Sequence, residues 1–291
     1  MKFGHHQSFY LRMNWLSKAI KMTQEDERFF FDEFAFEKIG LGKNMVKSLR
    51  YWVVATTVME EVKNEERQSI HRLTPIGRLI AEYDRFARLP ITAAVLHTLL
   101  VSNKEGAPTW YWFFNEHTQR STSNEELLSA LIDWSSTQLA RSISPNTLKR
   151  DLDCMKQMYT VSVRHNDDPE DIVASPLSGL GMLIESKEHF IKHSPEDRLI
   201  ELDALYFALL RYCEVNQVDS VTLEELLVKP LLWGKLFHLS SNRILNTMEL
   251  LQASTDYPVR LIRTNQLNVL NIDVEDSNAF LKKAYKWKAG R

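Results

Sequence analysis

The residues best suited to catalysis stand close to the start of the chain. His5 and His6 follow a glycine, and Arg12 comes after a short run that contains two aromatic side chains. A histidine can act as a general base, as a metal ligand or as a pH-dependent switch. We therefore take His5, His6 and Arg12 as candidate catalytic residues. A histidine pair that only supports packing is the alternative.

Acidic residues offer two patterns that could hold a divalent metal. Glu61-Val62-Lys63 matches the Glu-x-Lys fragment of metal-dependent nucleases, although a fragment this short also arises by chance. Asp151 and Asp153 stand two positions apart in a predicted helix, so their side chains should point in different directions. The metal ligands stay unassigned, and Mg²⁺ or another divalent metal remains an option as cofactor.

The clearest DNA-binding signal is a basic helix that follows the glycine turn Gly40-Leu41-Gly42. Its predicted buried face consists of Met45, Leu49 and Trp52, and Phe34, Phe36 and Ile39 should hold it against the preceding helix. The other faces carry Lys43, Asn44, Lys47, Ser48, Arg50 and Tyr51. Such groups can contact phosphates and base edges. We expect Lys43, Asn44, Lys47 and Arg50 to bind DNA, with an ordinary solvated face as the alternative.

The same turn does not form a nucleotide site. It lacks the longer glycine spacing and the Lys-Ser/Thr pair of a P-loop. The sequence also contains no nucleophile elbow, kinase motif set or dinucleotide fingerprint. These absences argue against nucleotide hydrolysis and against those enzyme classes.

Two later helices divide their faces in a similar way. The first begins at Ser144-Pro145, a strong helix start, and should bury Leu148, Leu152, Met155 and Tyr159. It presents Lys149 and Arg150, which we expect to add a second DNA contact. The second begins at Ser240-Ser241, and its pattern suits a protein interface as well as it suits DNA binding. The C-terminal stretch Ser277 to Arg291 is basic, and both nucleic-acid binding and docking of a final helix stay open.

The elements that would position these residues are mainly α-helices. Helical spacing of apolar residues is common, and strand signals are short, as in the hairpin pattern of Val259 to Ile272. We predict a mainly α fold with several winged-helix or helix-turn-helix-like units and short β-hairpin wings. The predicted domains are 1–103, 104–195 and 196–291, with a linker near Arg164 to Asp171.

Composition restricts the class of protein. The chain has 291 residues, 44% hydrophobic and 25% charged, with a net charge of −2 and two cysteines. This is typical of a globular protein without a disulfide framework. No window approaches the roughly 20 apolar residues of a membrane helix, so we expect a cytoplasmic protein. Near-neutral charge allows DNA binding only if cations gather locally.

Several motifs together resemble a bacterial family. They are Phe3-Gly4-His5 with Leu11-Arg12 and Trp15-Leu16, Leu41-Gly42-Lys43-Asn44-Met45-Val46 with Arg50-Tyr51-Trp52, Leu73-Thr74-Pro75 with Gly77, and Thr109-Trp110-Tyr111-Trp112-Phe113-Phe114-Asn115. In this combination the chain is similar to the SspB-like family, a family of long-unknown function that accompanies DNA phosphorothioation genes. The family pattern has an acid after Gly-His, where this chain has His6.

The resemblance implies a protein that binds double-stranded DNA and nicks one strand in an antiviral defence system. Nicking would let partners replace a non-bridging phosphate oxygen with sulfur. The implied partners are a cysteine desulfurase, an ATP-pyrophosphatase-like sulfur-transfer protein and an ATPase, and a homodimer is a further option. The alternatives are a non-enzymatic DNA-binding adaptor or transcriptional regulator, and a protein-interaction scaffold that touches no DNA.

Overall fold

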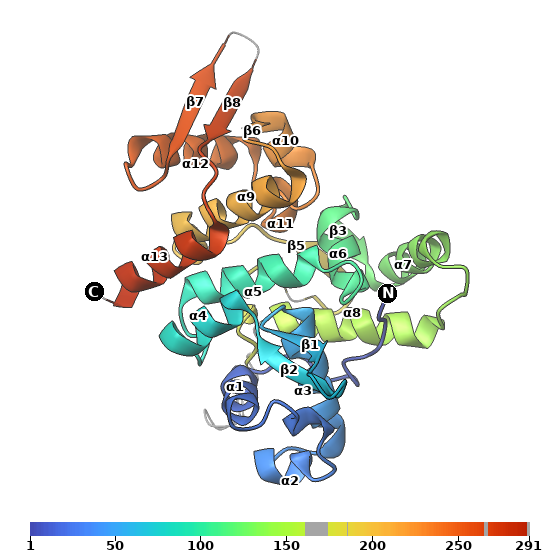
Figure 1. Cartoon of the computed structure of the whole chain (residues 1–291). Helices are drawn as coiled ribbons and strands as arrows, with labels where there is room; N and C mark the ends of the chain where they lie inside the picture. Colours follow the sequence, from blue (N-terminus) through green and yellow to red (C-terminus); the bar gives the residue numbers. More distant parts are fainter. Residues whose placement is uncertain (161–173, 185, 265–266, 290–291) are drawn as a thin grey trace, which may run out of the picture.

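The protein is mainly helical, as predicted, and its strands form small antiparallel sheets. The computed structural model describes residues 1–160, 174–184, 186–264 and 267–289. In Figure 1 most of the N-terminal part lies at the bottom, the central part in the middle and most of the C-terminal part at the top. The predicted linker near 164–171 lies wholly outside the described residues, as does the middle of the turn in the predicted C-terminal hairpin.

The N-terminal part contains the predicted glycine turn and basic helix. Its elements are α1 (Trp15–Glu25), the 3-10 turn η1 (Phe29–Phe31), α2 (Ala35–Ile39), α3 (Lys43–Ala55), β1 (Met59–Lys63), β2 (Ser69–Leu73) and α4 (Pro75–Tyr83). Gly40 ends α2 in the left-handed conformation with φ of 66°, which glycine adopts without strain. The antiparallel hairpin β1–β2 then follows α3 and contacts it.

The central part is built around a buried helix. Its elements are α5 (Pro90–Ser102), α6 (Pro108–Asn115), β3 (Ser121–Ser123), α7 (Asn124–Gln138), α8 (Pro145–Tyr159), η3 (Ser178–Leu180), β4 (Leu183–Ile184) and β5 (His189–Lys192). Every residue of α5 from Ile91 to Val101 is buried. A proline opens α4, α5, α6 and α8, where its missing N–H is not needed. Strand β5 lies between β3 and β4.

The C-terminal part resembles the central part in that one strand precedes several helices and two paired strands follow them. Its elements are α9 (Leu202–Asn216), β6 (Ser220–Thr222), α10 (Leu223–Val228), α11 (Trp233–Leu236), α12 (Ser241–Ala253), β7 (Val259–Arg263), β8 (Asn268–Ile272) and α13 (Ser277–Ala289). The predicted hairpin is confirmed as β7–β8, and β8 also pairs with β6. The hairpin projects from the top of the molecule, whereas α13 returns to pack on α4 and α9 (Figure 1).

Helix α5 joins the central part to the C-terminal part through buried polar contacts. His97 of α5 lies 2.6 Å from the Tyr159 hydroxyl of α8 and 2.7 Å from the Leu236 carbonyl oxygen of α11. Thr92 of α5 lies 2.8 Å from the Tyr285 hydroxyl of α13. The buried apolar side chains form one continuous cluster through all three parts. The domain boundaries 1–103, 104–195 and 196–291 stay predictions.

Several local predictions are confirmed. Ser144 caps α8 by accepting a hydrogen bond from Thr147, and Ser240 caps α12 in the same way from Arg243. The buried face of α8 is the predicted one, with Leu148, Leu152, Met155 and Tyr159. Within the described residues, no helix is long and apolar enough to cross a membrane.

We predict that the free energy of unfolding falls as the pH falls from about 6.5 to about 4. Burial lowers the pKa of His97 from 6.5 to about 4. Between these two pH values the unfolded chain therefore binds a proton at His97 that the folded chain does not bind. The His97 contribution is therefore complete above pH 6.5, decreases through this window by about 3 kcal/mol, and changes no further below it.

Urea unfolding at a series of pH values measures this effect. His97→Gln should unfold more easily at pH 7 and show a shallower pH slope, while His189→Gln, at an exposed position of β5, should keep the wild-type slope. Equal slopes for His97→Gln and wild type would contradict the prediction.

Candidate functional site

The N-terminal segment, residues 3–12, packs against α8 and places His5 and His6 beside α3. Gly4 has a φ of +70°, and a Cβ built on it would lie 2.7 Å from Cγ2 of Thr147. Only glycine fits both the conformation and the close approach. The Gly4 backbone N–H donates to Oδ1 of Asp151, at 2.9 Å, which fixes the segment to α8.

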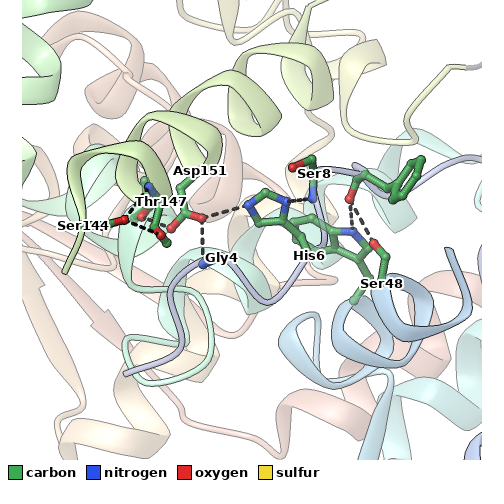
Figure 2. A network of polar contacts seen from close by, with 10 residues as sticks. Gly4, His6, Ser8, Ser48, Ser144, Thr147 and Asp151 are labelled. Atoms are coloured by element: carbon green, nitrogen blue, oxygen red, sulfur yellow. Dashed lines mark hydrogen bonds and ion pairs between the residues drawn. The ribbon is translucent and has the colours of Figure 1, made fainter. Parts of the chain in front are cut away.

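His6 forms the centre of this contact. Its Nε2 lies 2.8 Å from Oδ1 of Asp151, and the Ser8 backbone N–H donates to its Nδ1 at 3.0 Å (Figure 2). Because Nδ1 accepts a hydrogen bond, the ring proton belongs on Nε2, from which it is donated to Asp151. Both side chains are only 1% exposed. The ring also stacks on Trp52, with centroids 6.1 Å apart.

Asp151 has its hydrogen-bonding capacity met by the protein. Oδ1 accepts from Gly4 and His6, and Oδ2 accepts from the Thr109 hydroxyl of α6 at 2.7 Å. Asp153 is exposed, so the two aspartates point apart, as expected from their spacing. We call this group, Gly4, His6, Thr109 and Asp151, the buried clamp. Its geometry suits a structural connection, because a carboxylate with three donors is held in place.

The three predicted catalytic residues are not brought together. His6 is buried in the clamp, whereas His5 is exposed on the neighbouring surface. Arg12 is half-buried among aromatic rings, and its guanidinium carbon lies 5.4 Å from the Trp15 ring centroid. Burial, with the charge of Lys2 adding to it, lowers the pKa of His5. Of the three, His5 is the one placed to meet a ligand.

A basic groove of about 900 Å³ lies beside His5. It is bounded by the N-terminal segment, α3 and the β1–β2 hairpin. Its charged lining residues are Lys2, His5, Lys47, Arg50, Glu60, Glu61 and Lys63. Two of the predicted DNA-binding residues, Lys47 and Arg50, therefore share a groove with one predicted catalytic residue. Lys43 and Asn44 are exposed at the start of α3.

Arg50 connects the groove to its acidic wall. Its guanidinium donates to Oε2 of Glu61 at 2.9 Å and lies over the Phe31 ring, 4.2 Å from the centroid. Partial burial raises the pKa of Glu61, but the hydrogen bond and charge of Arg50 outweigh this, so the net pKa is lowered. His71, fully buried, lies 3.7 Å from the same oxygen, and burial with Arg50 lowers its pKa to about 4.

The Glu-x-Lys pattern does not form a metal cage with its neighbours. Glu61 is engaged by Arg50, and Lys63 donates to the Ser69 hydroxyl at 2.7 Å. Within the described residues, no group of three or more histidines, cysteines or carboxylates could hold a metal ion. The groove therefore offers carboxylates without a preformed ligand set.

The prediction for one exposed face of α3 is wrong at Ser48. Ser48 was expected beside Asn44 on the exposed side, yet it is fully buried and donates to the Phe9 carbonyl oxygen at 3.0 Å. Trp52 donates to the same oxygen at 2.8 Å (Figure 2). The N-terminal segment covers this side of the helix, which sequence spacing could not reveal.

The predicted apolar face is right at Leu49 and Trp52 and weaker at its N-terminal end. Leu49 and Trp52 are fully buried, whereas Met45 is half-buried. Phe34, expected to support α3, is 53% exposed. The turn before α2 carries Phe34 outward, whereas Ile39 is buried and Phe36 is half-buried.

The second pair of predicted DNA-binding residues lies on the far side of the clamp. Lys149 and Arg150 are both exposed on α8. Nη2 of Arg150 lies 3.9 Å from the point where a Gly4 Cβ would stand. The N-terminal segment therefore separates the cations of α8 from those of α3.

Comparison with known proteins places the chain in a family. Residues 3–285 match the family of proteins of unknown function DUF4007. The chain belongs to the DUF4007 family. Comparison with curated proteins finds no match.

This DUF4007 member has the fold of SspB. A crystal structure of SspB and one of magnesium ion-bound SspB each match with a TM-score of 0.87 and 21% identity, covering 100% of this chain and 89% of the other. The resemblance to the SspB-like family is confirmed. At this identity, the comparison establishes a shared fold.

Sequence reasoning missed the role of Asp151, although a signal was present. Asp151 falls at helical spacing between Leu148 and Met155, on the buried face of α8. An acid on an apolar face must find donors, because an unpaired buried charge is strongly unfavourable. That position on the apolar face is the sequence signal for a buried partner of Asp151.

We predict that Asp151→Asn destabilises the fold by about 3 kcal/mol, because the amide cannot accept all of the hydrogen bonds of the carboxylate. The N-terminal segment should also become more open to proteolysis. Urea unfolding and limited proteolysis measure the two effects. Asp153→Asn, at an exposed position of the same helix, should change stability by less than about 0.5 kcal/mol. Equal stability of the two variants would rule out the clamp.

Proposed function

We propose that this DUF4007 member binds double-stranded DNA along the basic groove, as a component of a DNA phosphorothioation defence system. The single observation that supports it most is the gathering of Lys2, Lys47, Arg50 and Lys63 on one concave surface of a chain whose net charge is −2. Local concentration of cations is what phosphate binding requires. The likeness to SspB supports the assignment to such a system.

We further propose that the three parts are winged-helix units. In the central part, β3 precedes α7 and α8, and β4 and β5 follow. The C-terminal part repeats this order with β6, α10, α12, β7 and β8. In helix-turn-helix proteins the second helix contacts DNA, so α8 would contribute Lys149 and Arg150 as a second contact.

The proposed activity is nicking of one strand, with His5 as the general acid or base. His5 is accessible at the groove, and the partial burial of its ring, which lowers its pKa, favours the neutral imidazole that a base requires. His6 would position the segment that carries His5. A nick would let a cysteine desulfurase, an ATP-pyrophosphatase-like sulfur-transfer protein and an ATPase complete sulfur insertion.

We propose that any Mg²⁺ enters together with DNA. Mg²⁺ keeps several waters and binds proteins through one or two carboxylates plus substrate phosphates. Glu60 is an exposed carboxylate of the groove, and Glu61 is held by Arg50. The magnesium ion-bound form of SspB supports this choice of metal.

A non-enzymatic DNA-binding adaptor is the second candidate function. The burial of His6 and the separate place of Arg12 favour it, because the predicted catalytic group is not assembled. An adaptor would use the same groove without cutting the strand.

We predict that Lys47→Glu weakens binding to duplex DNA by about tenfold or more, since it removes a charge-assisted contact to phosphate. The slope of the binding constant against salt concentration, on logarithmic scales, should decrease by the equivalent of about one phosphate contact. The loss of affinity should be similar for every DNA sequence. Fluorescence anisotropy over a range of salt concentrations measures this. Lys21→Glu, exposed on α1 outside the groove lining, is the matched control. Equal losses for both variants would argue against a specific groove.

We predict that the protein converts supercoiled plasmid to open circles in the presence of Mg²⁺ and the system's partners. His5→Ala should lower the rate by about a hundredfold, because general acid–base catalysis contributes at least this much. His189→Ala should nick like wild type. Absence of open circles at every protein concentration, with and without partners, would exclude the nickase and leave the adaptor.

A further inference from the structure

A second cavity, of about 460 Å³, lies between the central and C-terminal parts. Four cationic side chains line it: Arg120, Lys192, Lys235 and Arg243. They come from the connection between α6 and β3, the end of β5, α11 and α12. No Asp or Glu is among its described lining residues. The cavity therefore concentrates positive charge away from the basic groove.

Lys192 is the most unusual of these cations. It is only 8% exposed, and its Nζ donates to the carbonyl oxygen of Phe113 at 2.6 Å and to that of His117. Both acceptors are neutral, so they orient the ammonium group without balancing its charge. Burial, with the charge of Lys235 adding to it, lowers the pKa of Lys192 to about 7. The repulsion between the Lys192 and Lys235 side chains is relieved when an anion binds between them.

His238 lines the same cavity with an unsatisfied ring nitrogen. Its Nε2 is buried and has no hydrogen-bond partner among the described residues. The residue has a φ of 54°, which few non-glycine residues adopt. A buried polar atom without a partner is unfavourable, so such an atom in a cavity indicates a missing ligand.

The start of α12 adds to the positive potential. Ser240, the N-cap of this 13-residue helix, lines the cavity, so the positive end of the helix dipole lies at its edge. Arg243 in the first turn is oriented by the Pro195 carbonyl oxygen at 2.6 Å and by the exposed carboxylate of Asp197. Asp197 partly neutralises Arg243 and leaves the other three cations of the cavity without a carboxylate partner in the described part of the chain.

We infer that this cavity is a binding site for a phosphate group, carried by a small molecule or by a DNA end. Phosphate oxygens accept several charge-assisted hydrogen bonds at once, and the guanidinium groups of Arg120 and Arg243 match their geometry. The volume is in the range that holds a small molecule. The cavity shares no described lining residue with the groove, so this site is independent of DNA binding and nicking there.

Isothermal titration of the full chain with inorganic phosphate tests the site. We expect one phosphate per chain, and Lys235→Gln should weaken its affinity by about tenfold through loss of a charge-assisted contact. Lys235 makes no side-chain hydrogen bond or ion pair within the described residues, so this variant should keep the wild-type melting temperature. Lys229→Gln, outside the cavity lining on the neighbouring connection, is the matched control and should bind like wild type.

A second variant keeps the test decisive if Lys235→Gln unfolds. Arg120→Gln changes an exposed residue of the lining and should also weaken phosphate binding about tenfold. Absence of binding heat with phosphate, or equal affinity of wild type and both cavity variants, would overturn the inference.

Competition experiments identify the source of the phosphate. Displacement of phosphate by dAMP indicates a nucleotide. Displacement by a duplex with a 5′-phosphate, but not by the same duplex with a 5′-hydroxyl, indicates a DNA end. If neither competes, inorganic phosphate itself is the ligand, and all three results support a phosphate site.

Discussion

The buried carboxylate of Asp151 holds the candidate site in shape. Moving a carboxylate out of water is unfavourable by several kcal/mol unless donors surround it. Here the donors are the Gly4 N–H, the His6 Nε2–H and the Thr109 hydroxyl, which belong to the N-terminal segment and α6, while the acceptor belongs to α8. One charge therefore joins three segments that lie far apart in the sequence. Its removal leaves each donor without a partner.

The clamp also decides which surfaces of α3 are free. The segment that it anchors passes over Ser48 and Trp52, which both donate to the Phe9 carbonyl oxygen. That side of α3 is closed, and the side with Lys43 and Lys47 stays open to solvent. The same segment places His5 on the wall of the groove, which Lys2 also lines. Stability of the clamp and shape of the groove are thus two consequences of one contact.

Positive charge gathers at two separate places in a chain that is slightly acidic overall. In the groove, Glu60 and Glu61 accompany the cations, and Arg50 is paired with Glu61. In the second cavity the described lining contains cations and histidines without a carboxylate. The first arrangement suits a long polyanion that makes many weak contacts, and the second suits one compact anion.

The sequence by itself determined the helical class, the helix starts at Ser144 and Ser240, the hairpin at Val259 to Ile272 and the apolar face of α8. These follow from local rules, namely capping, periodicity and alternation, which act within a few residues. It also determined that Lys47 and Arg50 would share a surface, because they lie one turn apart. Only the tertiary structure decided that His6 is buried and His5 exposed, that Ser48 faces the interior, and that Lys192 joins three other cations. Each of these depends on a segment distant in sequence, and local patterns carry no information about which distant segment covers a given face.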